Sequence, residues 1–207
     1  VVLVPVVLIA LYRVVPPPTT PTILAEAWRR GGVSRQWVAI GDVAPAARRA
    51  IVAAEDADFC RHWGFDMRAI RAAIEAGARR GASTISQQTV KNLLLWQGRS
   101  WPRKAAEAAL TPLAEAVLPK RRILELYLNV AEFGPGIFGI EAAARHYYDV
   151  PASALSARQA ARLAMVLPAP KRRSPEALSP ALNRRARSVA AGAALIAEDG
   201  RAACFDD

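Results

Sequence analysis

Two acidic residues, Glu55 and Asp56, open the segment EDADFCRHWGFD, which also carries an aromatic ring and an imidazole. Glu55, Phe59 and His62 are spaced i, i+4 and i+7, and a helix with this spacing places all three side chains on one face. A carboxylate held beside these two rings could act as a general base or acid. For this triplet taken alone, the alternative is a solvated acid above a buried histidine.

A second polar group follows in GASTISQQTVKN, where donor and cationic side chains recur at helical spacing: Thr84, Gln88, Lys91 and Asn92. We expect Ser83 to cap this helix. The N–H groups at a helix start, with a lysine two turns on, can hold an anion such as a diphosphate. The alternative is an ordinary amphipathic helix.

A third segment, SWPRKAAEAAL, supplies Arg103 and Glu107 at i, i+4 spacing, so both face the same way on a helix. Glu107 offers a second carboxylate besides Glu55, and Arg103 with Lys91 offers two cations suited to a departing diphosphate. The alternative is a surface ion pair. The combination favours glycosyl transfer from a phosphate-linked donor over glycoside hydrolysis, for which two acids suffice.

The composition is that of a folded, basic protein. Of the 207 residues 53% are hydrophobic, and 28 Lys and Arg against 18 Asp and Glu give a net charge of +10, which favours a polyanionic partner. Nucleic acid, anionic lipid head groups and a diphosphate substrate all fit this charge. Cys60 and Cys204 are the only cysteines, so a paired-cysteine zinc site is excluded. The sequence leaves two states open for them, two free thiols or, in an oxidising compartment, one disulfide.

Helical periodicity dominates the chain and predicts a mainly α-helical fold with no second domain. Glycine and proline clusters mark the breaks between the periodic stretches. The predicted helices are 44–57, 66–79, 84–95, 102–118, 120–131, 139–148, 156–167 and 181–198.

The first twelve residues are uninterrupted apolar chain, enough for a helix of roughly 18 Å against a hydrocarbon core of roughly 30 Å. Because the sequence opens with Val1 rather than Met, we expect residues 1–15 to be the C-terminal part of a longer transmembrane helix. A buried strand or core helix is the alternative. Prolines in 16–22 predict an extended spacer, followed by one domain over 23–200 and a tail over 201–207.

Five segments, in order and spacing, resemble the motifs of glycosyltransferase family 51, the peptidoglycan glycosyltransferases. The resemblance covers most of the chain from about residue 50 to 180, in Glu55 to His62, Gly81 to Asn92, Arg103 to Ala108, Arg121 to Tyr148 and Ala157 to Pro175. Ser86 departs from the threonine of many members but keeps the hydroxyl. The sequence shows no SxxK or KTG pattern of a penicillin-binding domain, so it resembles the monofunctional biosynthetic enzymes.

This resemblance implies a lysozyme-like helical lobe plus a small hydrophobic, membrane-facing lobe that includes residues 66–80. Apolar and basic side chains mix there, as suits lipid tails and anionic head groups. A core helix with solvated arginines is the alternative. These residues are Phe65, Met67, Ile70 and Ile74 with Arg68, Arg71, Arg79 and Arg80. The implied location is the outer face of the bacterial cytoplasmic (inner) membrane, with a single-pass anchor.

The resemblance also assigns roles. Glu55 matches the general base that removes the proton from the 4-hydroxyl of the acceptor lipid II, while undecaprenyl diphosphate leaves the donor with inversion. Glu107 matches a position that supports the diphosphate side or the acceptor. The implied substrate-binding residues are Asp56, Phe59 and His62 around the base, and Ser83, Thr84, Gln88, Lys91, Asn92 and Arg103 in the donor region.

The implied partners are lipid II and the growing glycan strand, membrane lipid, a moenomycin-type inhibitor and other cell-wall synthesis proteins, and not nucleic acid. The sequence requires no cofactor, and a divalent cation, Mg²⁺ or Mn²⁺, is implied only by the resemblance. Two alternatives remain open: a lysozyme-like peptidoglycan-cleaving enzyme, and a basic helical nucleic-acid-binding or scaffold protein.

Overall fold

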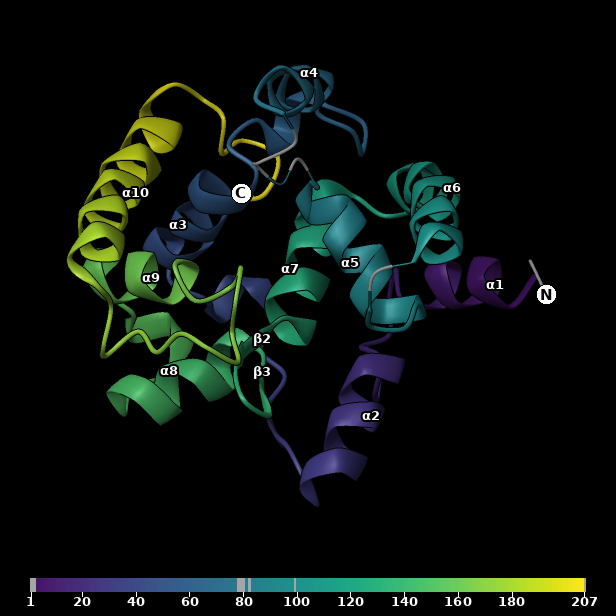
Figure 1. Cartoon of the computed structure of the whole chain (residues 1–207), viewed down its shortest axis with the longest axis horizontal. Coiled ribbons are helices and arrows are strands. Elements are labelled where there is room, and N and C mark those ends of the chain that lie inside the picture. Colours follow the sequence, from purple (N-terminus) through teal and green to yellow (C-terminus); the bar gives the residue numbers. More distant parts are fainter. Residues whose placement is uncertain (1–2, 78–80, 82, 99, 207) are drawn as a thin grey trace.

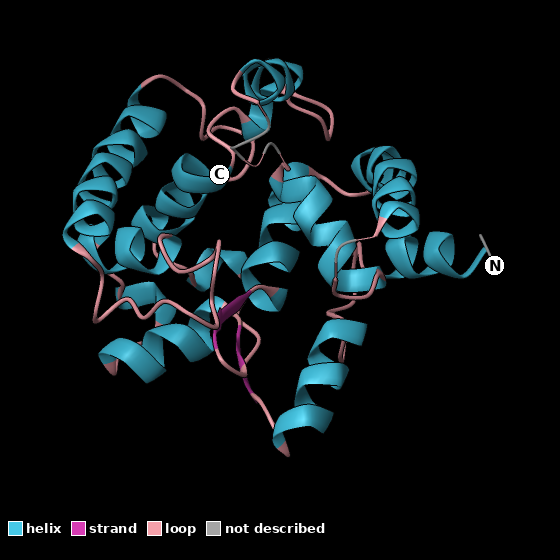
Figure 2. Cartoon of the chain, in the orientation of Figure 1, coloured by secondary structure: helices cyan, strands magenta, loops and turns pink. Residues whose placement is uncertain are grey.

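The computed structural model describes residues 3–77, 81, 83–98 and 100–206, and within them the chain is mainly helical (Figures 1 and 2). All eight predicted helices are confirmed, with ends that shift by four residues or fewer. The helices are α1 (Leu3–Leu11), α2 (Pro21–Arg30), α3 (Pro45–Glu55), α4 (Met67–Glu75), α5 (Ile85–Leu94), α6 (Trp101–Val117), α7 (Lys120–Val130), α8 (Ile140–Tyr148), α9 (Ala157–Ala164) and α10 (Pro180–Glu198).

Helix α2 was not predicted, because the prolines in 16–22 indicated an extended spacer. Thr20 caps it by accepting a hydrogen bond from the Ile23 backbone N–H, and Pro21 occupies the first turn, where a missing N–H costs nothing. The same pairing of a capping hydroxyl with an early proline begins α6 at Ser100 and α10 at Ser179. The last two residues of the expected 16–22 spacer therefore belong to α2.

The core is built around two groups of packed helices. Helix α3 packs against α9 and α10, and α5 packs against α6 and α7. Helix α7 carries the densest apolar face, with Leu124, Leu126 and Leu128 fully buried. Burying each such side chain stabilises the fold by about 1.5–3 kcal/mol relative to exposure. The two groups together hold the ends of α3 and α5 near each other.

A three-stranded sheet joins early and late parts of the chain: β1 (Ser34–Arg35), β2 (Glu132–Gly134) and β3 (Ile137–Phe138). Strand β3 lies in the middle, parallel to β1 and antiparallel to β2. Beside it, the Asn129 amide accepts a hydrogen bond from the Val38 N–H and donates one to the Val38 carbonyl, each 2.9 Å long. Gly139 has φ +88° and passes so close to Asn129 that an added Cβ would lie 3.2 Å from its carbonyl oxygen.

Helix α1 packs against α6, where Ile9 and Tyr12 are buried while Val4, Val7 and Leu11 remain exposed. None of the helices in the described ranges has the length and hydropathy needed to cross a bilayer.

Helix α4 buries none of its residues and lies at one edge of the molecule (Figure 1). Asp66 caps it by accepting hydrogen bonds from Arg68 N and Ala69 N. Of the apolar residues in the predicted membrane-facing lobe, Met67 and Ile74 are 56% and 69% exposed, whereas Phe65 and Ile70 are partly buried. Arg79 and Arg80 of that lobe lie outside the described residues.

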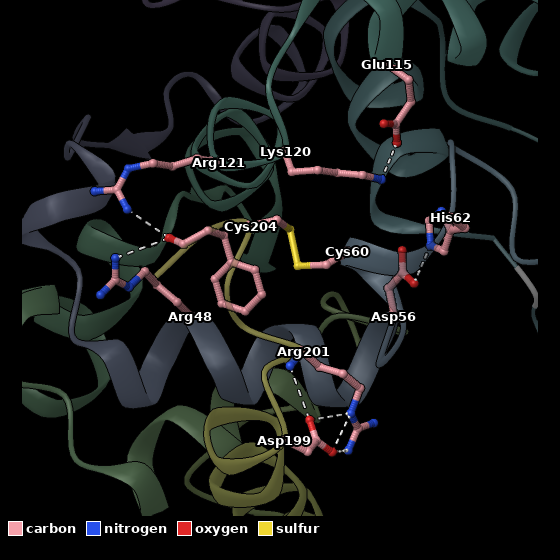
Figure 3. The surroundings of a disulfide bond; sticks show 11 residues. Arg48, Asp56, Cys60, His62, Glu115, Lys120, Arg121, Asp199, Arg201 and Cys204 are labelled. Carbon is pink, nitrogen blue, oxygen red and sulfur yellow. Dashed lines mark hydrogen bonds and ion pairs between the residues drawn. A yellow bond between two sulfur atoms is a disulfide. The ribbon is translucent and has the colours of Figure 1, made fainter. Parts of the chain in front are cut away.

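Cys60 and Cys204 form a disulfide (Figure 3), with their Cα atoms 5.6 Å apart and a separation of 144 positions in the sequence. Of the two states that the sequence left open, the disulfide is therefore the one present. Sequence spacing could not show the pairing, because it depends on how α10 returns toward the end of α3.

Candidate active site

Glu55 is the last residue of α3, and its side chain projects from the helix end into a cleft. Nε2 of Gln88, on α5, donates a 2.9 Å hydrogen bond to Oε2 of the carboxylate. Burial raises the pKa of Glu55, while that hydrogen bond and the charges of Arg185 and Lys91 act in the opposite direction. A carboxylate with a raised pKa is a stronger base once it is ionised, which suits proton abstraction.

Asp56 and His62 lie behind Glu55 and fix the loop that follows it. Helix α3 ends at Glu55 and Phe59–Arg61 is a short 3-10 turn, so the prediction that Glu55, Phe59 and His62 share one helix face is wrong. Instead, Nε2 of His62 lies 2.8 Å from Oδ1 of Asp56, and Nδ1 accepts from the Gly64 N–H. Figure 3 marks the contact between His62 and Asp56 with a dashed line. Because Nδ1 is an acceptor, Nε2 carries the proton of the imidazole and donates a hydrogen bond to Asp56.

The second oxygen of Asp56 accepts a 2.9 Å hydrogen bond from the backbone N–H of Ile85, the first residue of α5. This contact ties the end of α3 to the start of α5. Phe59 is fully buried beneath the loop, with its ring 6.3 Å from that of His62. Asp56, Phe59 and His62 therefore hold the position of Glu55 from behind.

The cap of α5 is Thr84, not Ser83. Thr84 accepts from the Gln87 N–H, and the Gln87 side chain accepts from the Thr84 N–H. With the Ile85 N–H bound to Asp56, two of the first N–H groups of α5 already have partners inside the protein. The predicted anion site at this helix start is therefore wrong for those two donors. The Thr84 hydroxyl also donates to the Gly64 carbonyl, and Thr84 lines a cavity together with Glu55.

Three cavities adjoin around Glu55 and α5. The largest, about 650 Å³, is lined by Glu55, Ser83, Gln88, Lys91 and Arg185 among others. A second, about 420 Å³, also has Glu55 in its wall, and a third, about 230 Å³, shares Gln88 and Lys91 with the first. The Glu55 carboxylate thus lies where two hollows meet, so that a group on either side could reach it.

Asn92 lines the third cavity together with Tyr127 and Glu132. The Tyr127 hydroxyl, which is buried, donates a 3.2 Å hydrogen bond to Oε1 of Gln88. Because Tyr127 binds the amide oxygen, the amide nitrogen of Gln88 faces Glu55. Tyr127 was not singled out from the sequence, where it appears as one more apolar position of an amphipathic helix.

The cations form a cluster beside the largest cavity. Burial lowers the pKa of Lys91, while Glu107 raises it and Arg103 and Lys104 lower it further. Nη1 of Arg103 lies 2.9 Å from Oε2 of Glu107, and Lys104 pairs with the other carboxylate oxygen. The Arg103 and Glu107 side chains are only 11% and 3% exposed, so the alternative of a surface ion pair is wrong.

Glu107 is not among the described residues that line the cavities containing Glu55. Its carboxylate is enclosed by Arg103 and Lys104, and Nζ of Lys104 also donates a 3.1 Å hydrogen bond to Oγ of Ser83. Among the described residues, Glu107 is therefore linked to the cleft through Arg103 and Lys104 and through the contact of Lys104 with Ser83.

Comparison with known proteins identifies the family to which this chain belongs. The model of a family described as "Transglycosylase" matches residues 22–194. The chain belongs to the transglycosylase family. It is a glycosyltransferase of mainly helical fold.

Three named relatives resemble this transglycosylase over nearly its full length. A "Biosynthetic peptidoglycan transglycosylase" of Jannaschia sp. (strain CCS1) is 61% identical over 197 residues, which cover 95% of this chain and 82% of the relative. Proteins of the same name from Rhodospirillum centenum and Caulobacter vibrioides are 49% and 43% identical, over 98% and 97% of this chain and 90% and 89% of theirs.

Two further cations of this transglycosylase belong to the site and were missed in the sequence. Arg185 reaches the cleft from α10, a helix whose sequence carries no local signal for chemistry. Lys104 stands next to Arg103 in the third motif, and its (i, i+3) spacing to Glu107 was the available clue.

The residues present do not fit a metal ion held by protein ligands. In the described part of the chain, no three His, Cys, Asp or Glu side chains gather as a metal site would require. Besides Glu55, three carboxylates near these cavities already have partners: Asp56 has His62 and Ile85, Glu107 has two cations, and Glu132 has the Gly136 N–H and Lys171. We therefore derive no step through a protein-bound metal.

Proposed function

We propose that this transglycosylase is a monofunctional enzyme that polymerises lipid II into glycan strands. The observation that carries the proposal is the placement of Glu55, a desolvated carboxylate where two hollows meet, with Lys91 and Arg185 in the wall of the larger. One hollow provides room for a donor with its diphosphate, and the other for an acceptor sugar. Membership of the family and the names of the relatives support this substrate class.

In the proposed reaction Glu55 removes the proton from the acceptor's 4-hydroxyl. In the described part of the chain the hydrogen bond from Gln88 occupies Oε2 and none reaches Oε1, which is therefore free for the acceptor hydroxyl. The hydroxyl oxygen forms a bond to the anomeric carbon of the donor strand, and the bond from that carbon to the diphosphate oxygen breaks. The proton ends on Glu55, and undecaprenyl diphosphate leaves with the electron pair, inverting α to β.

Fixed cations stabilise the negative charge that develops on the leaving diphosphate. Lys91 lines the cleft, and the Arg103–Lys104–Glu107 cluster lies beside it. A diphosphate is a weak base and departs without being protonated, so the reaction needs one general base rather than the acid and base pair of a glycosidase. Glu107, enclosed by two cations, fits this scheme better than it fits a proton donor.

We further propose that the enzyme works at the outer face of the cytoplasmic membrane, held there by its N-terminal segment. Two observations support this. Exposed Val4, Val7 and Leu11 give α1 an apolar side that α6 does not cover. The Cys60–Cys204 disulfide suits an oxidising compartment such as the periplasm.

Any divalent cation would, in this proposal, bind the substrate's own diphosphate, since the protein gathers no ligand cage for one in its described residues. Polymerisation rates measured with EDTA, and again after adding back Mg²⁺ or Mn²⁺, test this. Dependence on the metal with no binding of Mn²⁺ to the free protein is the expected pattern, and tight binding to free protein would contradict it.

The function itself is tested by incubating the purified protein with labelled lipid II in detergent. We expect long glycan that muramidases digest and that moenomycin suppresses, and none from the Glu55→Gln variant. Release of fragments from finished peptidoglycan without synthesis from lipid II would instead show the hydrolase alternative.

A further inference from the structure

The residues that follow α10 return to the back of the candidate active site. We call this stretch, residues 199–206, the closing segment, and the loop 56–62 after Glu55 the base loop. The disulfide from Cys204 to Cys60 joins the two, and Figure 3 shows the bond with the charged groups around it. Neither residue 204 nor 205 belongs to the motifs on which the family resemblance rests.

The closing segment is held by more than the disulfide. Phe205 is fully buried, and its carbonyl accepts hydrogen bonds from Arg121 (2.9 Å) and Arg48 (3.5 Å). The Asp206 carboxylate pairs with both Arg48 and Arg49 on α3. Two helices of the core, α3 and α7, thus fix the segment in one position.

The closing segment contacts the base loop at Phe59 and Cys60, the central residues of that loop. Cys204 is bonded to Cys60, and the Phe205 ring lies 6.3 Å from that of Phe59. On its other sides the Phe59 ring meets His62 and the Lys120 ammonium, which is 4.4 Å from the ring centroid. The base loop is therefore held by the closing segment through Cys204 and Phe205, and by α7 through Lys120.

This clamp leads directly to the catalytic groups. His62 donates to Asp56, Asp56 accepts from the first N–H of α5, and α5 carries Gln88, which hydrogen-bonds Glu55. A shift of Phe59 and Cys60 would displace His62 and Asp56. Because Asp56 binds the first N–H of α5, the end of α3 would then move relative to the start of α5. A misplacement of 1 Å in such a site can cost about 10²-fold in rate.

We propose that the closing segment, fastened by Cys60–Cys204, is a positioning element of the active site, so that reducing this disulfide lowers kcat. The proposal rests on the proposed function for its rate measurement. Both cysteines are only partly buried, so a small dithiol can reach them. Dithiothreitol supplies two electrons and two protons: the S–S bond breaks, each sulfur becomes a thiol, and dithiothreitol closes to its cyclic disulfide.

The experiment compares oxidised protein, the same protein after dithiothreitol, and the Cys60→Ser/Cys204→Ser variant with and without dithiothreitol. We expect reduction to lower kcat for lipid II by roughly tenfold or more while KM changes little. The double variant should be as slow as reduced protein and insensitive to dithiothreitol, which controls for effects of the reagent on the assay. Glu198→Gln, which removes a negative charge from the exposed surface of α10 outside the closing segment, should behave as wild type.

Hydrogen exchange provides a readout that does not depend on catalysis. The Ile85 amide, bound to Asp56, should exchange faster after reduction, while the buried Ala143 amide, bound to Gly139 in α8, should not. Equal acceleration of both amides, or an unchanged kcat well below the unfolding temperature, would show that the disulfide only stabilises the fold and would overturn the proposal. The proposal would also be overturned if a thiol titration of denatured, unreduced protein found two free thiols. If oxidised protein makes no glycan, the proposed function fails, and the exchange of Ile85 still decides whether the clamp exists.

Discussion

Nε2 of Gln88 donates a 2.9 Å hydrogen bond to Oε2 of Glu55, and the buried hydroxyl of Tyr127 holds the opposite end of the same amide. The amide can thus offer its nitrogen to Glu55 without turning. A flipped amide would place its oxygen against an ionised carboxylate, which is unfavourable. The Glu55 carboxylate therefore selects the amide orientation, and the Tyr127 hydroxyl holds the amide in it by donating to the amide oxygen.

Removing this support should alter the pH dependence of catalysis. The Gln88 hydrogen bond lowers the pKa of Glu55 against the opposing effect of burial, so Gln88→Ala should raise it. The base is then protonated up to a higher pH, and the acid limb of kcat/KM moves to higher pH. Tyr127→Phe should move it the same way by a smaller amount. Gln36→Ala, at an exposed position that lines none of the three cavities, is the control, and acid limbs unmoved in both test variants would contradict the assignment.

The two glutamates should differ in kind. Glu55→Gln keeps shape but cannot accept a proton, so activity should fall by roughly 10²- to 10⁴-fold while moenomycin binding and the melting temperature are retained. Glu107→Gln leaves Arg103 and Lys104 without their shared counter-charge, so we expect a partial loss with weaker lipid II binding. If the two variants exchange these phenotypes, Glu107 is the base.

Lys91 should determine the alkaline limit of activity. Burial lowers the pKa of Lys91, so its charge is lost at a lower pH than that of an exposed lysine, and the diphosphate loses a cation. Lys91→Arg keeps the charge at every accessible pH, so the alkaline limb of kcat should move to higher pH even if the maximal rate falls. Lys91→Ala should cost about 10²- to 10³-fold at neutral pH. An alkaline limb that is identical in wild type and Lys91→Arg would assign it to another group.

Membrane attachment can be tested without disturbing the core. Val4, Val7 and Leu11 are exposed, whereas Ile9 and Tyr12 pack against the protein. Wild type should fractionate with membranes and resist high salt, and the Val4→Ser/Val7→Ser/Leu11→Ser variant should become extractable with an unchanged melting temperature. If wild type itself washes off with salt alone, the attachment is electrostatic, through basic residues, rather than apolar.

Local signals predicted the helices well because capping residues and apolar periodicity act over a few residues. The stretch 120–131, for example, became α7 over Lys120–Val130. Helix α2 was missed because a proline such as Pro21 occurs both in extended spacers and in the first turn of a helix. The Thr20 cap is what marks it as the start of a helix. The three motif segments around Glu55, Lys91 and Arg103 could be identified from residue types at helical spacing.

Relations between distant residues could not be predicted in the same way. The Cys60–Cys204 pair, the burial of Phe205 and the arrival of Arg185 in the cleft depend on how α10 packs against α3. The contact from Asp56 to the Ile85 N–H was hidden too, because the predicted helix ran through residue 57 and left no bend at Asp56. Helical spacing assigned Phe59 and His62 to the right neighbourhood for the wrong geometric reason.

The small sheet has a consequence for how the molecule folds. Val38 and Asn129, which flank it, are 91 positions apart in the sequence, and β1 pairs with β3 in parallel, the arrangement that needs the longest connection. Contacts between residues so far apart in the sequence form late in folding, because the intervening chain must first lose conformational entropy. They therefore slow folding relative to a helical bundle of equal size. During synthesis, β1 must therefore wait until more than half of the chain has been made before β3 can pair with it.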